Sequence, residues 1–301
     1  LISLFGFCPP IEMIDHHQCH AASSYYASDL ETATIVTFDW SGDGVSSSIW
    51  LGDNNQLKLI ESIKKPNSLG IFYAAFTQLI GFERGDEYKV MGLASYGSPN
   101  VCLDSVLNIS HPIYQLNPEI LKKNYRNMQQ ITYSNLLRQL FNNYWRPRYG
   151  KLEQRHMDLA ASVQKYFEIA AKNLVEYAVK KTGVKDVCLA GGGALNCTSN
   201  GKLLQNLNLR SIYVPPFPND SGCSFGGAAI HSIRKGQTIK PLQTAQLGPA
   251  FSDEQIHKDL ELLKCGGIYS KNIEEEVAEE ICSGKLVGWF QGGLEVGPRA
   301  L

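Results

Sequence analysis

The chain from residue 158 onward alternates predicted helices with short apolar strands, and this alternation narrows the possible folds more than any other feature. Apolar residues recur at three- and four-residue steps over residues 158–181, where they predict an amphipathic helix that Gly183 closes. The apolar runs at residues 186–190 and 211–214 are typical of buried strands, and a helix signal follows each of them. This order of elements predicts an α/β fold.

A turn rich in glycine and aspartate, Asp39-Trp40-Ser41-Gly42-Asp43-Gly44, links two predicted strands at residues 34–38 and 45–51. The bare backbone N–H groups of such a turn can cradle a phosphate, and its aspartates can hold a cation or orient a nucleophile. An ordinary Asp-Gly hairpin is the alternative. Two aspartates with two glycines at the end of a strand favour a functional turn.

A second glycine-rich turn, Gly191-Gly192-Gly193-Ala194-Leu195-Asn196, joins a predicted strand to a helix expected near residues 197–207, which Asn196 can cap. Glycines at this place let a ligand approach the backbone at a helix N-terminus, where anions are favoured. The spacing matches neither the dinucleotide fingerprint nor the P-loop. The turn therefore predicts contact with the ribose, base or phosphate of a nucleotide, and a purely structural turn is the alternative.

A histidine pair predicts half of a metal site. Asp15 is a suitable N-cap for a helix on which His16 and His20 share one face while His17 points elsewhere. Two imidazoles need at least one more ligand, preferably a carboxylate, to leave open positions for chemistry. Asp220 lies where a predicted strand gives way to a helix, a usual place for such a carboxylate, although capping that helix is its commoner role. A chance pairing of histidines remains the alternative.

Composition excludes several classes of protein. The chain has 301 residues, 44% of them hydrophobic, and a formal net charge of -1, so a broad nucleic-acid or membrane surface is not expected. Its eight cysteines include no Cys-x-x-Cys pair, which argues against the usual structural zinc site and fits a reducing, cytoplasmic compartment. No stretch is long and apolar enough to span a membrane, and a signal peptide is not expected. The start at Leu1 and the abrupt end at Leu301 lead us to expect a fragment.

Several further segments give weaker signals. Glu87 and Lys89 stand beside an apolar segment and could either line a pocket or form a solvated pair. Residues 98–150 are interpreted as a variable insertion that could form part of an acceptor pocket. Residues 234–249 have no apolar period and contain glycines and prolines, so they predict a linker.

Three elements are predicted after this linker. Ser252 begins a capping box for a helix that ends near Leu263, and a second helix is expected at residues 274–282. The apolar run at residues 285–290 predicts a strand.

Taken together, these stretches resemble the ATP-dependent O-carbamoyltransferases, a family that includes nodulation-factor and antibiotic-tailoring enzymes and is related to the tRNA threonylcarbamoyl-transfer enzyme. The motifs occur in the family's order and span almost the whole chain, at residues 16–22 (HHQCHAA), 39–44 (DWSGDG), 87–94 (EYKVMGLA), 191–196 (GGGALN), 219–222 (NDSG) and 295–301 (EVGPRAL). The Glu-Tyr-Lys and Gly-Pro-Arg-Ala-Leu motifs are specific, whereas each glycine-rich turn alone is weak.

The resemblance implies an actin-like (ASKHA), two-lobed ATPase fold, followed by the start of an α/β domain that forms carbamoyl-adenylate. Residues 1–233 would then bind metal and nucleotide and transfer the carbamoyl group, residues 234–249 would be the linker, and residues 250–301 would begin the second domain. Relative to the family, an amino-terminal strand hairpin and most of the adenylate-forming domain are missing, and Gly293 stands where the family usually has Arg.

The resemblance also implies which residues form the site. A metal, typically iron, would be bound by His16, His20 and Asp220, and Arg299 would belong to the carbamoyl phosphate site. The proposed catalytic residues are Asp39, Asp43 and Lys89, of which Asp39 or Asp43 would assist the acceptor hydroxyl. The nucleotide would contact Ser41, Gly42, Asp43, Gly44, Gly192, Gly193 and Asn196. The implied cofactors are Fe²⁺ or another divalent metal, ATP and Mg²⁺.

The resemblance predicts an enzyme that uses carbamoyl phosphate and ATP, through carbamoyl-adenylate, to carbamoylate a hydroxyl of a sugar or natural product. One alternative is a carbamoyl or threonylcarbamoyl transferase that acts on tRNA or on a maturation protein. The near-neutral charge and the lack of Lys/Arg clusters argue against a nucleic-acid partner. Another alternative is a non-catalytic, actin-like nucleotide-binding module. A sugar kinase is a lesser rival because a kinase has no use for the histidine pair.

Overall fold

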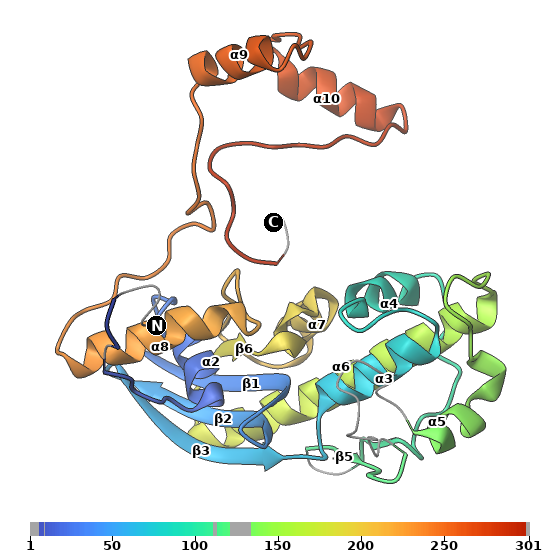
Figure 1. Cartoon of the computed structure of the whole chain (residues 1–301). Helices are drawn as coiled ribbons and strands as arrows, with labels where there is room; N and C mark the ends of the chain where they lie inside the picture. Colours follow the sequence, from blue (N-terminus) through green and yellow to red (C-terminus); the bar gives the residue numbers. More distant parts are fainter. Residues whose placement is uncertain (1–5, 9, 111–112, 121–133, 299–301) are drawn as a thin grey trace. The chain divides into compact units, whose positions relative to one another are not determined.

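The computed structural model describes residues 6–8, 10–110, 113–120 and 134–298. The chain divides into two compact units, Leu1–Leu242 and Gln243–Leu301. The division falls inside residues 234–249, and the assignment of a linker there, with a second domain from residue 250, stays a proposal. The units are described separately (Figure 1).

A five-stranded sheet organises the first unit, with the order β3-β2-β1-β6-β7. Its strands are β1 (Thr32–Gly42), β2 (Val45–Asp53), β3 (Gln56–Lys64), β6 (Asp186–Ala190) and β7 (Ser211–Tyr213). The first three strands pair antiparallel, and β1, β6 and β7 run parallel through helical crossovers. An antiparallel meander continued by two parallel strands is the sheet of one actin-like lobe, so the expected α/β, actin-like fold class is confirmed.

The sheet separates two layers of helices (Figure 1). Alternate residues of β1 face opposite sides: Val36 and Phe38 belong to a core with α3 (Leu69–Leu79) and α6 (Gln154–Thr182). Ala33 and Ile35 belong to a second core with α2 (His16–Tyr25) and α8 (Ser221–Arg234). Asp39 has the same parity as Ala33 and Ile35, so β1 directs it to the side of the sheet that carries α2.

The predicted hairpin and helices are present. Asp43 and Gly44 have φ angles of 50° and 82°, and Gly42 pairs with Val45, so β1 and β2 are joined by a two-residue turn that needs positive φ at both positions. Gly183, at φ 76°, ends α6 in the left-handed conformation. The remaining elements of this unit are α4 (Glu87–Ala94), β4 (Leu107–Asn108), β5 (Gln115–Leu116), α5 (Asn135–Leu140), η1 (Asn142–Tyr144), η2 (Gly192–Leu195) and α7 (Cys197–Asn206).

The second unit contains two helices, α9 (Asp253–Leu262) and α10 (Ile273–Cys282). The Ser252 hydroxyl accepts a hydrogen bond from the Gln255 N–H, as the predicted cap requires. The strand predicted at residues 285–290 is wrong: within Gln243–Pro298, the part of this unit that the structure describes, no segment forms a ladder. A strand forms only when a neighbouring strand pairs with its backbone N–H and C=O groups. The apolar residues of this segment are not buried in a core either, since the side chain of Leu286 is fully exposed.

None of the helices in the described ranges combines the length and hydropathy needed to cross a bilayer.

Candidate metal centre

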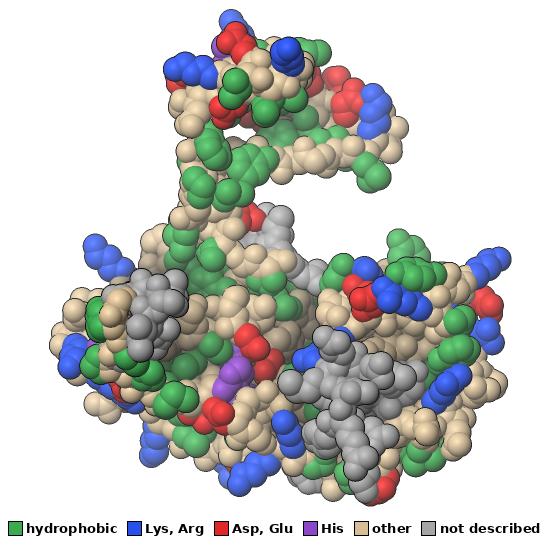
Figure 2. Space-filling model, viewed as in Figure 1, with side chains coloured by type: hydrophobic (Ala, Val, Ile, Leu, Met, Phe, Trp, Pro, Cys, Tyr) green, Lys and Arg blue, Asp and Glu red, His purple; other side chains and the backbone are tan. Residues whose placement is uncertain are grey.

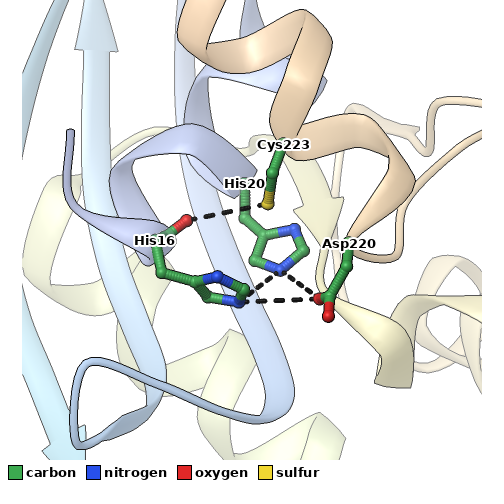
Figure 3. A group of neighbouring side chains, drawn as sticks. All are labelled: His16, His20, Asp220 and Cys223. Atoms are coloured by element: carbon green, nitrogen blue, oxygen red, sulfur yellow. Dashed lines mark hydrogen bonds and ion pairs between the residues drawn. The ribbon is translucent and has the colours of Figure 1, made fainter. Parts of the chain in front are cut away.

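Helix α2 places two imidazoles side by side. The Asp15 carboxylate accepts a 2.9 Å hydrogen bond from the Gln18 N–H and caps the helix. His16 and His20 are four residues apart and share a face, so their Nε2 atoms lie 3.0 Å apart. His20 is completely buried, and no hydrogen-bond partner reaches its Nδ1. The two Nε2 atoms therefore point at one spot beside the helix (Figure 3).

Helix α8 brings a carboxylate to that spot. Asp220 occupies the N-cap position of α8, but its side chain makes no capping hydrogen bond. Its Oδ1 lies 3.3 Å from the Nε2 of His20 and 3.6 Å from the Nε2 of His16. On the face of the molecule in Figure 2, histidine atoms reach the surface with acidic side chains beside them. The carboxylate thus faces the histidines instead of the helix backbone.

A glycine lets α8 approach α2 closely enough for this contact. A Cβ added at Gly226 would lie 1.9 Å from the carbonyl oxygen of Cys19, a distance that no side chain can occupy. Gly226 is buried and follows Asp220 by six residues. The packing of these two helices therefore sets the separation between Asp220 and the histidines.

Asp39 supplies a second carboxylate from the end of β1. Its Oδ2 lies 3.3 Å from the Nε2 of His16 and 3.9 Å from that of His20, while its Oδ1 accepts a 3.0 Å hydrogen bond from the Gly192 N–H. Burial acts to raise the pKa of Asp39, but His16, the charge of His20 and backbone N–H groups outweigh it and hold the pKa well below its usual range. The hydrogen bond between the Asp39 carboxylate and the Nε2 of His16 raises the pKa of His16.

These distances fit a metal ion. A triangle with sides of 3.0, 3.3 and 3.6 Å has its centre about 1.9 Å from each corner, close to the roughly 2.0–2.2 Å bonds of nitrogen and oxygen to a small divalent metal. Histidine with carboxylate is a donor set that iron, zinc and manganese all accept. The buried His20 ring directs its Nε2 into this centre, so the three predicted ligands are able to hold an ion.

Cys223 belongs to the same cluster and was not predicted. Its Sγ and the ligand atoms of the other three residues all lie within 4.8 Å of one another. The thiol donates a long, 4.0 Å hydrogen bond to the His16 carbonyl, and burial raises its pKa to about 12. The sequence did contain a signal for Cys223. It follows Asp220 by three residues, and residues three apart on a helix share a face.

The hairpin turn lies against α2. The Asp43 carboxylate accepts a 2.9 Å hydrogen bond from the His16 N–H. A Cβ added at Gly42 would lie 2.0 Å from the His16 ring, so only glycine fits there. The turn expected to contact a nucleotide is therefore joined directly to the helix that carries the histidines.

The second glycine-rich turn meets the same edge of the sheet because β1 and β6 are parallel neighbours. The side chain of Asn196 caps α7 through the Ser199 N–H and pairs with the Gln164 amide, with both of its hydrogen bonds to that amide at 2.9 Å. The side-chain oxygen and nitrogen of Asn196 therefore already make hydrogen bonds within the protein.

Lys89, another predicted residue, lies elsewhere in the first unit. Lys89 forms a 2.8 Å ion pair with Asp86, and α4, which carries it, lies on the opposite side of the first unit from α2 (Figure 1). Burial raises the pKa of the neighbouring Glu87. Arg299 lies outside the described residues.

The fold and this cluster define an actin-like α/β domain with a candidate metal centre, and comparison with known proteins identifies its family. A family model described as "Carbamoyltransferase N-terminus" matches residues 5–230. The chain belongs to this carbamoyltransferase family, as its motifs predicted.

Two curated relatives show how much of a longer protein the chain represents. The nodulation protein NolNO of Sinorhizobium fredii is 34% identical over 97% of this chain and 42% of its own length. The nodulation protein NolO of Bradyrhizobium diazoefficiens is 34% identical over 96% of this chain and 52% of its own length. The chain therefore spans about half the length of the curated relatives it matches.

Among solved structures, full-length HypF in its phosphate- and nucleotide-bound form is similar over 75% of this chain and 44% of that chain, with a TM-score of 0.48 and 18% identity.

Proposed function

We propose that this chain is the metal- and nucleotide-binding part of an O-carbamoyltransferase, which transfers a carbamoyl group from carbamoyl-adenylate to a hydroxyl of a small molecule. The observation that carries the proposal is the convergence of His16, His20 and Asp220 at the sheet edge where the two glycine-rich turns meet. Membership of the carbamoyltransferase family supports the chemistry.

His16, His20 and Asp220 would hold the metal, which we take to be iron, with Asp39 beside them. The ion would supply Lewis acidity toward a carbamoyl or phosphate oxygen and would position that oxygen. Asp39 is a weak base because its pKa is low, so we propose that it adds negative charge beside the ion and does not take the acceptor proton. The acceptor proton would then pass to another group, for which Asp43 in the adjacent turn is the candidate.

The backbone of residues 41–44 and of Gly193 would hold the phosphates of ATP or of the adenylate, with Mg²⁺ as counter-ion. Asn196 would shape the second turn rather than touch the nucleotide, since Ser199 and Gln164 occupy its amide. Arg299 would bind carbamoyl phosphate, and a role for Lys89 rests on its motif alone.

In the transfer step, the acceptor oxygen bonds to the carbamoyl carbon and the bond from that carbon to the adenylate phosphate oxygen breaks. AMP leaves, and the proton of the acceptor hydroxyl passes to the base. The Asp43 carboxylate accepts a hydrogen bond from the His16 N–H, so the proposed proton acceptor and the metal would lie close together.

The experiment is a transfer assay with the full-length protein under anaerobic conditions, with carbamoyl phosphate, ATP, Fe²⁺ and a panel of sugars and other hydroxylated products. We expect an acceptor to gain the mass of one carbamoyl group with wild-type protein and not with the His16→Ala/His20→Ala variant. If no acceptor gains this mass and no pyrophosphate is released, the proposal fails. A salt-dependent shift of tRNA would favour the alternative that acts on tRNA.

A further inference from the structure

His17 lies between the two cluster histidines in sequence, yet its ring points away from them. It is buried, with 1% of its surface exposed. Its Nε2 lies 3.0 Å from the carbonyl oxygen of Val45, and its Nδ1 lies 2.7 Å from the hydroxyl oxygen of Thr37. The ring therefore bridges α2 to both strands of the hairpin.

The Thr37 hydroxyl continues into a buried chain of polar groups on the same face of the sheet. Its Oγ1 lies 2.6 Å from the hydroxyl oxygen of Ser48 and also accepts a 3.1 Å hydrogen bond from the Ser48 N–H. The indole N–H of Trp50 donates to the Ser48 hydroxyl at 2.7 Å. A hydroxyl buried in an apolar core destabilises the fold unless its hydrogen is donated to an acceptor, so each of these hydroxyls is expected to donate.

The chemistry of the two ends fixes the direction of every hydrogen bond. A carbonyl oxygen only accepts, so the Nε2 of His17 must carry a hydrogen and donate to Val45. An indole N–H only donates, so Ser48 must accept from Trp50 and direct its own hydrogen to its remaining neighbour, Thr37.

Thr37 then accepts from Ser48, and its own hydrogen has one acceptor within reach, the Nδ1 of His17. The order of donation is therefore Trp50 to Ser48 to Thr37 to His17 to Val45.

We propose that His17 is a positioning residue, locked as the Nε2–H tautomer at the end of this one-directional chain, and that the chain fixes the orientation of α2 and hence of His16 and His20. The consequence for the ion rests on the proposed metal site. Groups hydrogen-bonded directly to metal-binding histidines commonly change metal affinity by roughly 10–100-fold when removed. This chain acts one residue further away, through the backbone of α2, so its loss should have an effect near the lower end of that range.

Two neighbouring contacts also restrain the first turn of α2. The His16 N–H donates to Asp43, and Gly42 lies directly against the His16 ring. The first turn of α2 is thus fixed by the backbone of β2, the side chain of β1 and the hairpin turn. A loss of the His17 anchor frees the rotation of this turn, and both Nε2 atoms move with it.

The first test needs no substitution. The ¹⁵N chemical shifts of the His17 ring in the uniformly labelled, metal-free chain report which nitrogen carries the hydrogen. We expect a protonated Nε2 and an unprotonated Nδ1. A protonated Nδ1 would reverse the direction of the chain and overturn the proposal, whatever the protein does with metals.

The second test is Co²⁺ affinity, measured by titration of the visible spectrum. Thr37→Val removes the hydroxyl that donates to His17 at nearly constant volume, and Thr37→Ser retains it. Thr34→Val is the matched control: Thr34 is another fully buried hydroxyl of β1, bonded to Thr182 and Val184 on the opposite face of the sheet.

We expect Thr37→Val to bind Co²⁺ about tenfold more weakly than wild type, with Thr34→Val and Thr37→Ser close to wild type. Equal affinity of Thr37→Val and Thr34→Val would overturn the positioning role. If wild-type protein binds no Co²⁺, the proposed metal site fails, and the tautomer of His17 still decides whether the chain exists. If Thr37→Val does not fold, the tautomer and Thr37→Ser decide the question.

Discussion

At the scale of single residues, the site depends on which polar atoms already have partners. The Asp220 carboxylate is mostly exposed and leaves its own helix uncapped, so one of its oxygens is available to the two imidazoles. The Asp39 carboxylate divides its oxygens between His16 and the Gly192 N–H. Negative charge and imidazole nitrogen thus meet at one point, an arrangement that a divalent cation relieves.

Asp220→Asn tests this arrangement, and Cys223→Ser, a substitution at a nearby position of α8, is compared with it. We expect Asp220→Asn to lose most of the bound metal, because it removes a charged oxygen 3.3 Å from the Nε2 of His20. Cys223→Ser should retain it, since His16, His20 and Asp220 supply the three proposed donors without the thiol. The check is metal content, together with the Co²⁺ spectrum. A thiolate charge-transfer band that Cys223→Ser abolishes would show instead that Cys223 is a ligand.

Two N-cap positions show where sequence reasoning reaches its limit at this scale. Asn196 and Asp220 both precede a helix, and both were predicted to contact a ligand or to cap. Asn196 caps α7, whereas Asp220 does not cap α8. The difference arises from what lies opposite each side chain, Gln164 in one case and His20 in the other, and both partners are remote in sequence. Only the tertiary fold decides between the two roles.

At the scale of elements, the contact between α2 and α8 holds the cluster together. Gly226→Ala tests it, because the new Cβ would fall 1.9 Å from the Cys19 carbonyl oxygen and push the helices apart. We expect a loss of about 1–3 kcal/mol in the free energy of unfolding and a weaker metal site. Gly227→Ala is the control in the same helix, since its Cβ would meet only the Cys19 Sγ at 3.8 Å. Equal behaviour of the two variants in denaturation and metal titration would contradict the account.

The start of α6 gives a prediction of pH dependence outside the metal site. The Nδ1 of His156 accepts a 2.9 Å hydrogen bond from the Glu153 N–H, and burial lowers the pKa of His156. The neutral ring therefore stabilises the fold above its unfolded-state pKa of about 6.5, and this contribution is lost as the pH falls through the lower folded-state value.

The measurement compares wild type with His156→Gln in urea between neutral pH and about pH 5. We expect the stability advantage of wild type to shrink as the pH falls, because glutamine does not titrate. The other histidines are common to both proteins and cancel. An advantage that stays constant over this range would rule out the capping role of the neutral ring.

Elements with strong local signals were predicted, and elements that depend on partners were not. The spacing of apolar residues in α6, together with Gly183 at its end, predicted both ends of that helix to within a few residues. The Asp43-Gly44 pair predicted the hairpin turn. β3 was missed because it lies at the edge of the sheet and carries polar residues on most of its exposed positions. The apolar run at residues 285–290 was wrongly predicted as a strand because composition alone does not supply a neighbouring strand.

At the scale of the whole molecule, the two units differ in how they are stabilised. The first unit has two cores on opposite faces of one sheet. In the second, neither α9 nor α10 buries a side chain. Burial of apolar surface is the main source of stability, so the energy that resists local unfolding is concentrated in Leu1–Leu242.

Hydrogen exchange tests this division. We expect the backbone amides of α9 and α10 to exchange much faster than those of β1, β6 and α6, and bound Co²⁺ to slow exchange in α2 and in the first turn of α8 alone. Protection of α9 and α10 equal to that of α6 would contradict it.

The family could be predicted from the sequence because its motifs are short local stretches in a fixed order. Two of them, at residues 39–44 and 191–196, end parallel neighbouring strands, where an α/β fold collects functional residues on one edge. The order of the strands was not predictable from the chain, since β1 pairs with β6 across more than a hundred intervening residues.

The central claim is that His16, His20 and Asp220 hold a metal ion, and metal analysis of anaerobically purified protein tests it most directly. We predict about one equivalent of metal, iron by our proposal, in wild type and none in the His16→Ala/His20→Ala variant purified in parallel. Wild-type protein that contains no metal, and takes none up when Fe²⁺ or Co²⁺ is supplied, would contradict the account and leave the histidine pair with a structural role.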